Sequence, residues 1–153
     1  MPFESLMFQL AQFFLWPVTV LVLLVFAYAV ISLGSFAVEW QRRRRQPGAV
    51  LVLGAQARSV EALELAVLKE LEGLRLCSRV APMLGLVATM IPMGPALVGV
   101  ASGQSQGVAQ SLAPAFAAVI VALVSASITF VVYSVRRRWL LSELLSVLEG
   151  SPA

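Results

Sequence analysis

The side chains best placed for chemistry in this sequence are hydroxyls that lie within long apolar stretches. Thr89 lies in one such stretch, and Ser125 and Thr129 lie in another. A hydroxyl both donates and accepts a hydrogen bond, so these side chains can support a chain of water molecules across an apolar layer. None of the three can change its charge, so an ion that follows this path must meet its titrating group elsewhere.

Most catalytic chemistry is excluded by residue types that the sequence lacks. It contains no His and no Asp, and Cys77 is its only cysteine. No imidazole base, Cys/His metal cluster or intramolecular disulfide can therefore form, and no glycine-rich loop indicates a nucleotide site. Cys77 is predicted to be a small buried apolar residue, with a reactive thiol as the alternative. We predict no enzyme activity, no metal and no cofactor.

The elements that must hold these hydroxyls are three apolar runs without charged residues: Val18–Val38, Val80–Ala101 and Leu112–Val135. About 20 apolar residues cross the roughly 30 Å of hydrocarbon in a bilayer, so each run is long enough to span it. Only 12% of the 153 residues are charged, against roughly 25% in a soluble domain. We therefore predict an all-α membrane protein with three transmembrane helices, a short helical cytoplasmic stalk and an N-terminal interfacial amphipathic helix.

The basic residues predict how the helices are oriented. All eleven Lys and Arg lie between Arg42 and Arg79 or at Arg136–Arg138, whereas the N-terminal segment and the loop 102–111 contain none. Basic segments stay in the cytoplasm, so the N-terminus is expected outside the cell membrane and the C-terminus in the cytoplasm. Arg42–Arg45 follow the first run, a stop-transfer pattern that favours a retained anchor over a cleaved signal peptide. The net charge of +3 is attributed to this topology and to contact with membrane lipid, not to nucleic acid.

The segments outside the runs are also predicted to be helical. Residues 2–15 place apolar and polar side chains on opposite faces, which predicts a helix in the outer interface that turns into the first span at Trp16-Pro17. The cytoplasmic segment 42–79 carries an apolar stripe, and the tail 136–153 adds a short helix. The stripe needs a cover, either in this chain or in a neighbouring subunit, and the latter is favoured because little chain lies inside. The stripe consists of Val60, Leu63, Val67, Leu71 and Leu74, and the predicted inner interface anchors are Arg42, Arg43, Arg44, Arg45, Arg136, Arg137 and Arg138.

Small residues line one face of each of the last two runs. Such faces let helices approach closely, so they indicate either plain helix packing or a narrow polar path between the two runs. Pro92 and Pro95 lie within the second run, where each removes a backbone hydrogen bond and predicts a kink. The two faces consist of Ala81, Gly85, Ala88, Thr89, Pro92, Ala96 and Gly99, and of Ala115, Ala118, Ala122, Ser125 and Thr129.

The run Ala81–Ile91, with the sequence APMLGLVATMI, resembles the A-P-x-x-G-L-x-G-T-V signature of the MotA/TolQ/ExbB proton channel family. Pro82 and Gly85 occupy fixed positions of that signature. The continuation Pro92–Leu97 and the ending Val132–Trp139 are similar to the short archaeal members of the family. The predicted topology also matches, with a basic segment between the first two spans and a short outer loop between the last two.

The resemblance implies a pentamer of such chains around a dimer of a single-span partner of the MotB/TolR/ExbD type, whose membrane Asp takes up and releases protons. Thr89 occupies the family's pore-facing Thr of the second span. Val119 falls at the family's other pore Thr when the Gly-Leu pair that follows it is aligned on residues 122–123. Valine has nearly the same shape without the hydroxyl, so one hydrogen-bonding ring would be missing. Ser125 and Thr129, one to two turns further on, are the candidates to compensate.

The first functional hypothesis is that the chain is a pore-forming, stator-like subunit of a proton-driven membrane motor complex. The alternative is a non-conducting scaffold of the same architecture, closed at Val119. A secondary transporter would need membrane charges that the three runs lack, and an enzyme is the remotest hypothesis. Flagellar rotation, outer-membrane energisation and surface-envelope tasks all use this family's architecture. The partner's outer domain decides among them.

Deleting Arg42–Arg45 should disturb insertion or orientation of the first span, because these residues supply the positive charge that holds its inner end. Protease accessibility of the N-terminus in intact cells, compared with membrane vesicles of opposite orientation, measures the change. An unaltered cleavage pattern in the deletion variant would contradict the predicted anchor.

Overall fold

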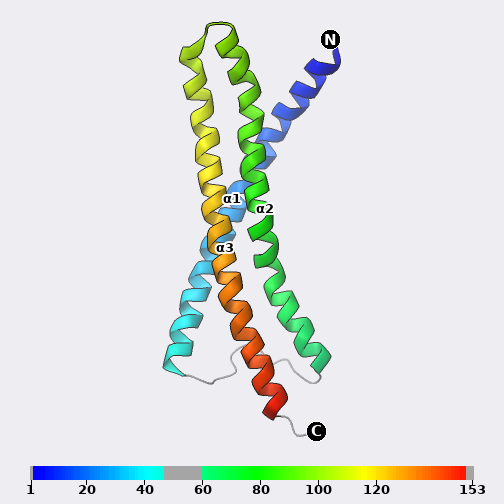
Figure 1. Cartoon of the computed structure of the whole chain (residues 1–153), viewed down its shortest axis with the longest axis vertical. Helices are drawn as coiled ribbons and strands as arrows, with labels where there is room; N and C mark the ends of the chain where they lie inside the picture. Colours follow the sequence, from blue (N-terminus) through cyan, green and yellow to red (C-terminus); the bar gives the residue numbers. More distant parts are fainter. Residues whose placement is uncertain (1, 47–59, 151–153) are drawn as a thin grey trace.

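The computed structural model describes residues 2–46 and 60–150, which form three long helices. Figure 1 shows two of them side by side and joined by a tight turn, with the first helix crossing behind them. All three are long and apolar enough to cross a membrane, so the predicted all-α membrane fold is confirmed. The elements are α1 (Pro2–Arg45), α2 (Val60–Ala101), the short 3-10 helix η1 (Ser105–Gly107) and α3 (Val108–Gly150).

Each helix is longer than a membrane is thick. The three contain 44, 42 and 43 residues, and at about 1.5 Å per residue each is roughly 65 Å long, about twice the hydrocarbon layer. The described parts of the segments 42–79 and 136–153 are therefore continuations of the long helices. An unbroken helix satisfies its interior backbone groups, so no helix end has to be capped at the membrane surface. Where the membrane surfaces cross the helices stays a prediction.

The turn predicted at Trp16-Pro17 is absent, because α1 continues through both residues. A turn there would leave several backbone groups without partners in an apolar layer, whereas Pro17 removes a single helical hydrogen bond. The ring of Phe8 lies 3.9 Å from the position that a Cβ on Gly94 would occupy. The N-terminal part of α1 thus continues past α2 (Figure 1). That residues 2–15 lie in the outer interface stays a prediction.

The small faces of α2 and α3 pack directly against each other. A Cβ on Gly85 would lie 3.0 Å from the Ala122 Cβ and 3.6 Å from the Val119 Cα, so a larger side chain there must push the helices apart. Ala81 and Ala88, about one turn to either side of Gly85, are also buried. Close helix packing, one of the two interpretations of these faces, is therefore what the described helices show.

The apolar stripe of the predicted cytoplasmic segment is covered by the same chain. Val67 and Leu71 on α2 form a buried cluster with Leu140 on α3. The expectation that a neighbouring subunit covers the stripe is therefore wrong for these residues, because α3 continues beyond the apolar run and brings its own side chains alongside α2. The side chains of Val60 and Leu63 lie outside the described part of the structure.

The outer surface of the bundle is largely apolar. Phe13, Trp16 and Ile31 on α1, and Met83 on α2, are among many large apolar side chains that are mostly exposed. A soluble monomer rarely exposes contiguous apolar area on this scale. The surface therefore fits contact with lipid or with other membrane helices.

Replacing Gly85 by Leu should destabilise the bundle by about 1–3 kcal/mol, because the added side chain overpacks the contact between α2 and α3. The thermal unfolding midpoint in detergent measures this effect. Gly34→Leu is the matched control, since no heavy atom lies within 4 Å of its Cβ position. Equal midpoints for the two variants would contradict the close approach at Gly85.

Candidate functional site

Thr89 presents its hydroxyl at the side of α2 and is half-buried. Its Oγ1 donates a hydrogen bond to the Leu86 carbonyl at 2.8 Å, and the Gly85 carbonyl lies 3.4 Å away. The proton is thus engaged by the helix backbone, while the oxygen keeps lone pairs for a water molecule or another donor. Thr89 can therefore accept a hydrogen bond from outside its own chain.

Ser125 and Thr129 lie inside the chain, and both are 0% exposed. The Ser125 Oγ donates to the Val121 carbonyl at 2.7 Å, and the Thr129 Oγ1 donates to the Ser125 carbonyl at 2.8 Å. Bonding to the preceding turn is the usual way in which a helix satisfies a buried hydroxyl. An ion path through these two residues would have to run within one chain, and that path stays a prediction.

Helix geometry separates these hydroxyls into two groups. Gly73 is held against α1, and Trp139 stacks on a ring of α1. Thr89 follows Gly73 by sixteen residues, a rotation of about 160°, and Val119 precedes Trp139 by twenty, about 200°. Thr89 and Val119 therefore lie on the side of α2 and α3 that faces away from α1, here called the α2–α3 face. Ser125 is rotated by about 240° from Val119 and points into the chain.

The prolines of the second run do not end the helix, because α2 runs on through Pro82, Pro92 and Pro95. All three are half-buried. Pro92 has no N–H, so it leaves the carbonyl of Ala88 without its helical donor. This acceptor adjoins Thr89 in the sequence, which adds polarity to an otherwise apolar part of α2.

An ion-pair network joins the three helices at the end of the bundle that holds Arg42–Arg45 and Arg136–Arg138, here called the basic end. It runs between α1, α2 and α3 through Glu39, Arg43, Arg136, Glu70 and Glu143.

Glu39 of α1 is the centre of this network. It accepts hydrogen bonds from Arg43 at 3.0 Å and from Arg136 of α3 at 3.1 Å. Arg43 also pairs with Glu143 of α3, and Arg136 lies 3.2 Å from a carboxylate oxygen of Glu70 on α2. Glu143 is only 5% exposed, so its charge must be compensated within the protein. Two of the predicted interface anchors, Arg43 and Arg136, thus connect helices.

Aromatic rings reinforce the same junction. Phe36 of α1 stacks on Trp139 of α3, with ring centroids 5.2 Å apart and planes 6° from parallel. The Arg43 guanidinium lies 4.8 Å from the Trp139 ring centroid, and Arg44 lies 4.5 Å from that of Trp40. Cations over indole rings are favourable contacts, so α1 is held to α3 by charge and by ring stacking together.

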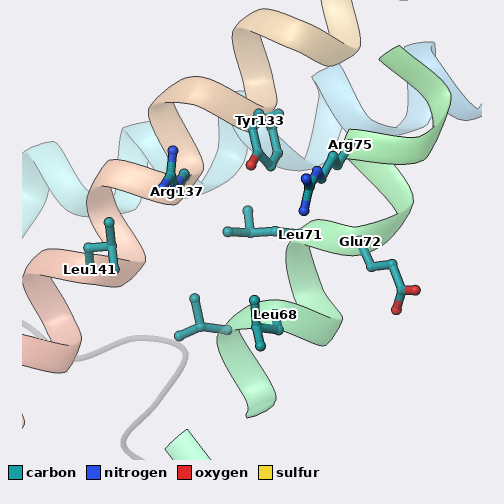
Figure 2. Close-up of a pocket in the computed structure, with 8 residues that line it drawn as sticks. Leu68, Leu71, Glu72, Arg75, Tyr133, Arg137 and Leu141 are labelled. Carbon is teal, nitrogen blue, oxygen red and sulfur yellow. The ribbon is translucent and has the colours of Figure 1, made fainter. Parts of the chain in front are cut away.

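Two adjoining hollows lie between α2 and α3 at the basic end, with volumes of about 430 and 520 Å³. Arg75, Tyr133 and Arg137 line both of them, and Figure 2 shows these residues around the space between the helices, with α1 behind. We call the two hollows together the basic groove. Its lining is completed by Val67, Leu68, Leu71, Glu72, Ser78, Arg79, Phe130 and Leu141.

Cys77 is half-buried just before the second apolar run. Burial raises the pKa of its thiol above the ordinary value, so the thiolate is scarce at neutral pH. Because the thiolate is the reactive form, this environment favours the small apolar role over the reactive one.

The comparisons with known proteins agree with the motif in α2. A family model described as the MotA/TolQ/ExbB proton channel family matches residues 52–148. No curated protein and no solved structure matched the chain. The three long apolar helices define a membrane protein, and the matching family is one of proton channels. The match covers more than half of the chain, which belongs to the MotA/TolQ/ExbB proton channel family.

Sequence reasoning identified the arginines of the basic end but missed their carboxylate partners. Glu39 stands four residues before Arg43, a spacing at which helical side chains of opposite charge meet. That local signal was available in the sequence. The pairing of Glu143 and Glu70 with arginines of other helices was not, because it depends on how the helices are aligned.

Replacing Glu39 by Gln should destabilise the bundle on the order of 2 kcal/mol, because two partly buried arginines lose their shared counter-charge. The thermal unfolding midpoint in detergent is the measurement. Glu149→Gln, an exposed change of the same type near the end of α3, is the control and should leave the midpoint in place. An unchanged midpoint for Glu39→Gln would show that the network contributes nothing to stability.

Proposed function

We propose that this chain is the pore-forming, stator-like subunit of a proton-driven membrane motor complex. Five copies form a ring in the cell membrane around a dimer of a single-span partner. The partner carries the Asp that takes up and releases protons, and each copy contributes its α2–α3 face to the ring interior. The N-terminus lies outside and the C-terminus in the cytoplasm.

The observation that carries the proposal is the combination of family membership with the absence of Asp, Glu, His, Lys and Arg from the three apolar runs. Proton relays inside membranes normally depend on Asp, Glu, His, Lys or Arg. A chain of a proton channel family that lacks all of these in its runs needs a second protein to bring the group that changes charge.

The position of Thr89 supports the α2–α3 face as the side that meets this partner. Its hydroxyl is half-buried on a face that α1 leaves uncovered, and it retains lone pairs for a hydrogen bond from outside the chain. Ser125 and Thr129 are enclosed by their own chain, so we assign them to helix packing in this proposal and leave the ion path to Thr89.

A non-conducting scaffold is the second candidate, and Val119 is the observation that favours it. Val119 lies on the α2–α3 face without a hydroxyl, next to the close contact at Gly85. If the face conducts nothing, Val119→Thr restores the missing hydroxyl at almost constant shape and creates proton flux in proteoliposomes that hold the partner. A conducting complex would already show flux without this change.

Thr89→Val should lower proton flux by about tenfold or more, because the shape is kept and only the hydrogen-bonding oxygen is lost. Flux is measured in proteoliposomes that contain the chain and its co-expressed single-span partner, with assembly checked by size-exclusion chromatography.

Thr129→Val is the matched control, since it makes the same change at a hydroxyl that is 0% exposed. We expect it to retain the flux. Unchanged flux in Thr89→Val would remove Thr89 from the path, and loss of flux in Thr129→Val alone would place the path inside the chain.

A further inference from the structure

The arginines of the basic end fall into two classes by their partners. Arg43 and Arg136 are neutralised by carboxylates of the same chain. Arg75, Arg79 and Arg137 line the basic groove and are exposed, and among the described residues none of them forms an ion pair with a carboxylate. The groove therefore gathers positive charge that the described chain leaves uncompensated.

The carboxylate nearest to these arginines does not cancel their charge. Glu72 lines the groove beside Arg75, but Figure 2 shows its carboxylate pointing away from α3. The groove also contains the hydroxyl-bearing side chains of Ser78 and Tyr133. The Ser78 hydroxyl already donates to the Arg75 carbonyl at 2.8 Å, so the arginine forks of both helices and the Tyr133 hydroxyl are the donors suited to carboxylate groups.

The groove continues the same faces that carry Thr89 and Val119. Arg137 follows Val119 by eighteen residues, about five full turns, so both lie on one side of α3. Arg75 precedes Thr89 by fourteen residues, about 40° from four full turns on α2. The basic groove is thus the basic-end continuation of the α2–α3 face, roughly 20–27 Å from Thr89 and Val119 along the helices.

We propose that the basic groove binds carboxylate side chains in the cytoplasmic end of the single-span partner. This inference rests on the proposed function, which places the partner's membrane helix against the α2–α3 face. A helix that crosses the membrane along Thr89 leaves the bilayer at the level of Arg75, Arg79 and Arg137. Its cytoplasmic end then meets three arginines from each copy of the ring.

A partner that binds the basic groove must have an unusual cytoplasmic flank. The cytoplasmic flank of a single-span protein is normally basic, and a basic flank would be repelled by this groove. The partner must therefore carry Asp or Glu in the segment just inside the membrane. Its orientation in the membrane must then depend on features other than positive charge in this segment. Seating those carboxylates also removes a positive barrier from the inner end of a cation path.

An anionic phospholipid headgroup offers similar chemistry at a similar depth. The groove lies on the same side of α2 and α3 as Thr89, and α1 packs on the other side. The proposed function places the partner on the Thr89 side, so this position favours the partner over lipid. Retention of lipid is therefore measured beside partner binding as the competing outcome.

The test uses the full chain co-expressed with its tagged single-span partner and compares two triple variants. Arg75→Gln, Arg79→Gln and Arg137→Gln together remove the groove charges. The control variant combines Arg42→Gln, Lys69→Gln and Arg138→Gln, which are also exposed, remove the same charge outside the groove and leave Arg43–Arg45 of the predicted anchor in place.

The readout is the salt dependence of partner retention on an affinity resin, with native mass spectrometry of bound phosphatidylglycerol alongside. We expect the groove variant to hold the partner about tenfold more weakly, with a shallower salt dependence, while the control stays near wild type. Arg137→Glu with a compensating Lys in the partner's acidic segment should restore retention, which separates lost pairing from lost folding.

Each other result overturns the inference. Equal retention by the groove variant and the wild type would contradict binding at the basic groove and would leave the proposed function unaffected. Loss of phosphatidylglycerol with partner retention intact would assign the groove to lipid. Equal weakening in both triple variants would show a general charge effect, and failure of the wild-type chain to retain any partner would remove the proposed function and this inference together.

Discussion

Charge is excluded from the three apolar runs of this protein and collected where the helices continue beyond them. An uncompensated charge inside a bilayer is costly, and the polar side chains in the runs are all hydroxyls. The charges outside the runs are divided in turn. Glu39 draws Arg43 and Arg136 into a network between the helices, whereas Arg75, Arg79 and Arg137 face the basic groove. The first group joins the helices of the bundle, whereas the second forms no ion pair with any carboxylate in the described part of the chain.

Close packing of α2 on α3 determines which side of the chain is left for that molecule. Gly85 lets the two helices approach so closely that a Cβ at this position would lie 3.0 Å from the Ala122 Cβ. Ser125 and Thr129 are fully buried within the same bundle. α1 then covers one side of the pair through Trp139 and the ion-pair network. Among the described helices, none covers the opposite side, which holds Thr89. This side thus presents the Thr89 hydroxyl on a largely apolar face that continues into the basic groove.

The sequence predicted the three membrane helices because uniform apolar runs have few other physical interpretations. It did not predict the unbroken α1, since Trp16-Pro17 has the local pattern of a turn and only the cost of free backbone groups decides against it. The cover of Val67 and Leu71 was also missed. An apolar stripe in the sequence shows that another surface must cover it. It does not show that Leu140, on the part of α3 beyond the apolar run, provides this cover.

The candidate site was predictable only in part, for a similar reason. The motif located Thr89 and Gly85, and helical spacing located the faces. Whether Ser125 points toward its own chain or toward another depends on how α1 packs against α3. Ion pairs between residues far apart in the sequence contribute to that packing. The arginines were interpreted as headgroup anchors because sequence cannot tell which of them meet Glu39, Glu70 or Glu143.

We propose that the side of α2 and α3 turned away from α1 meets the partner in an assembly, with α1 at its periphery. The most direct measurement is a cryo-electron microscopy map of the chain purified with its single-span partner. We expect the Thr89 side chains of all copies to point toward a central helix pair, with the basic groove against the partner's cytoplasmic end. A particle in which α1 lines the centre, or in which lipid fills the space beside Thr89 and no partner helix is present, would contradict it.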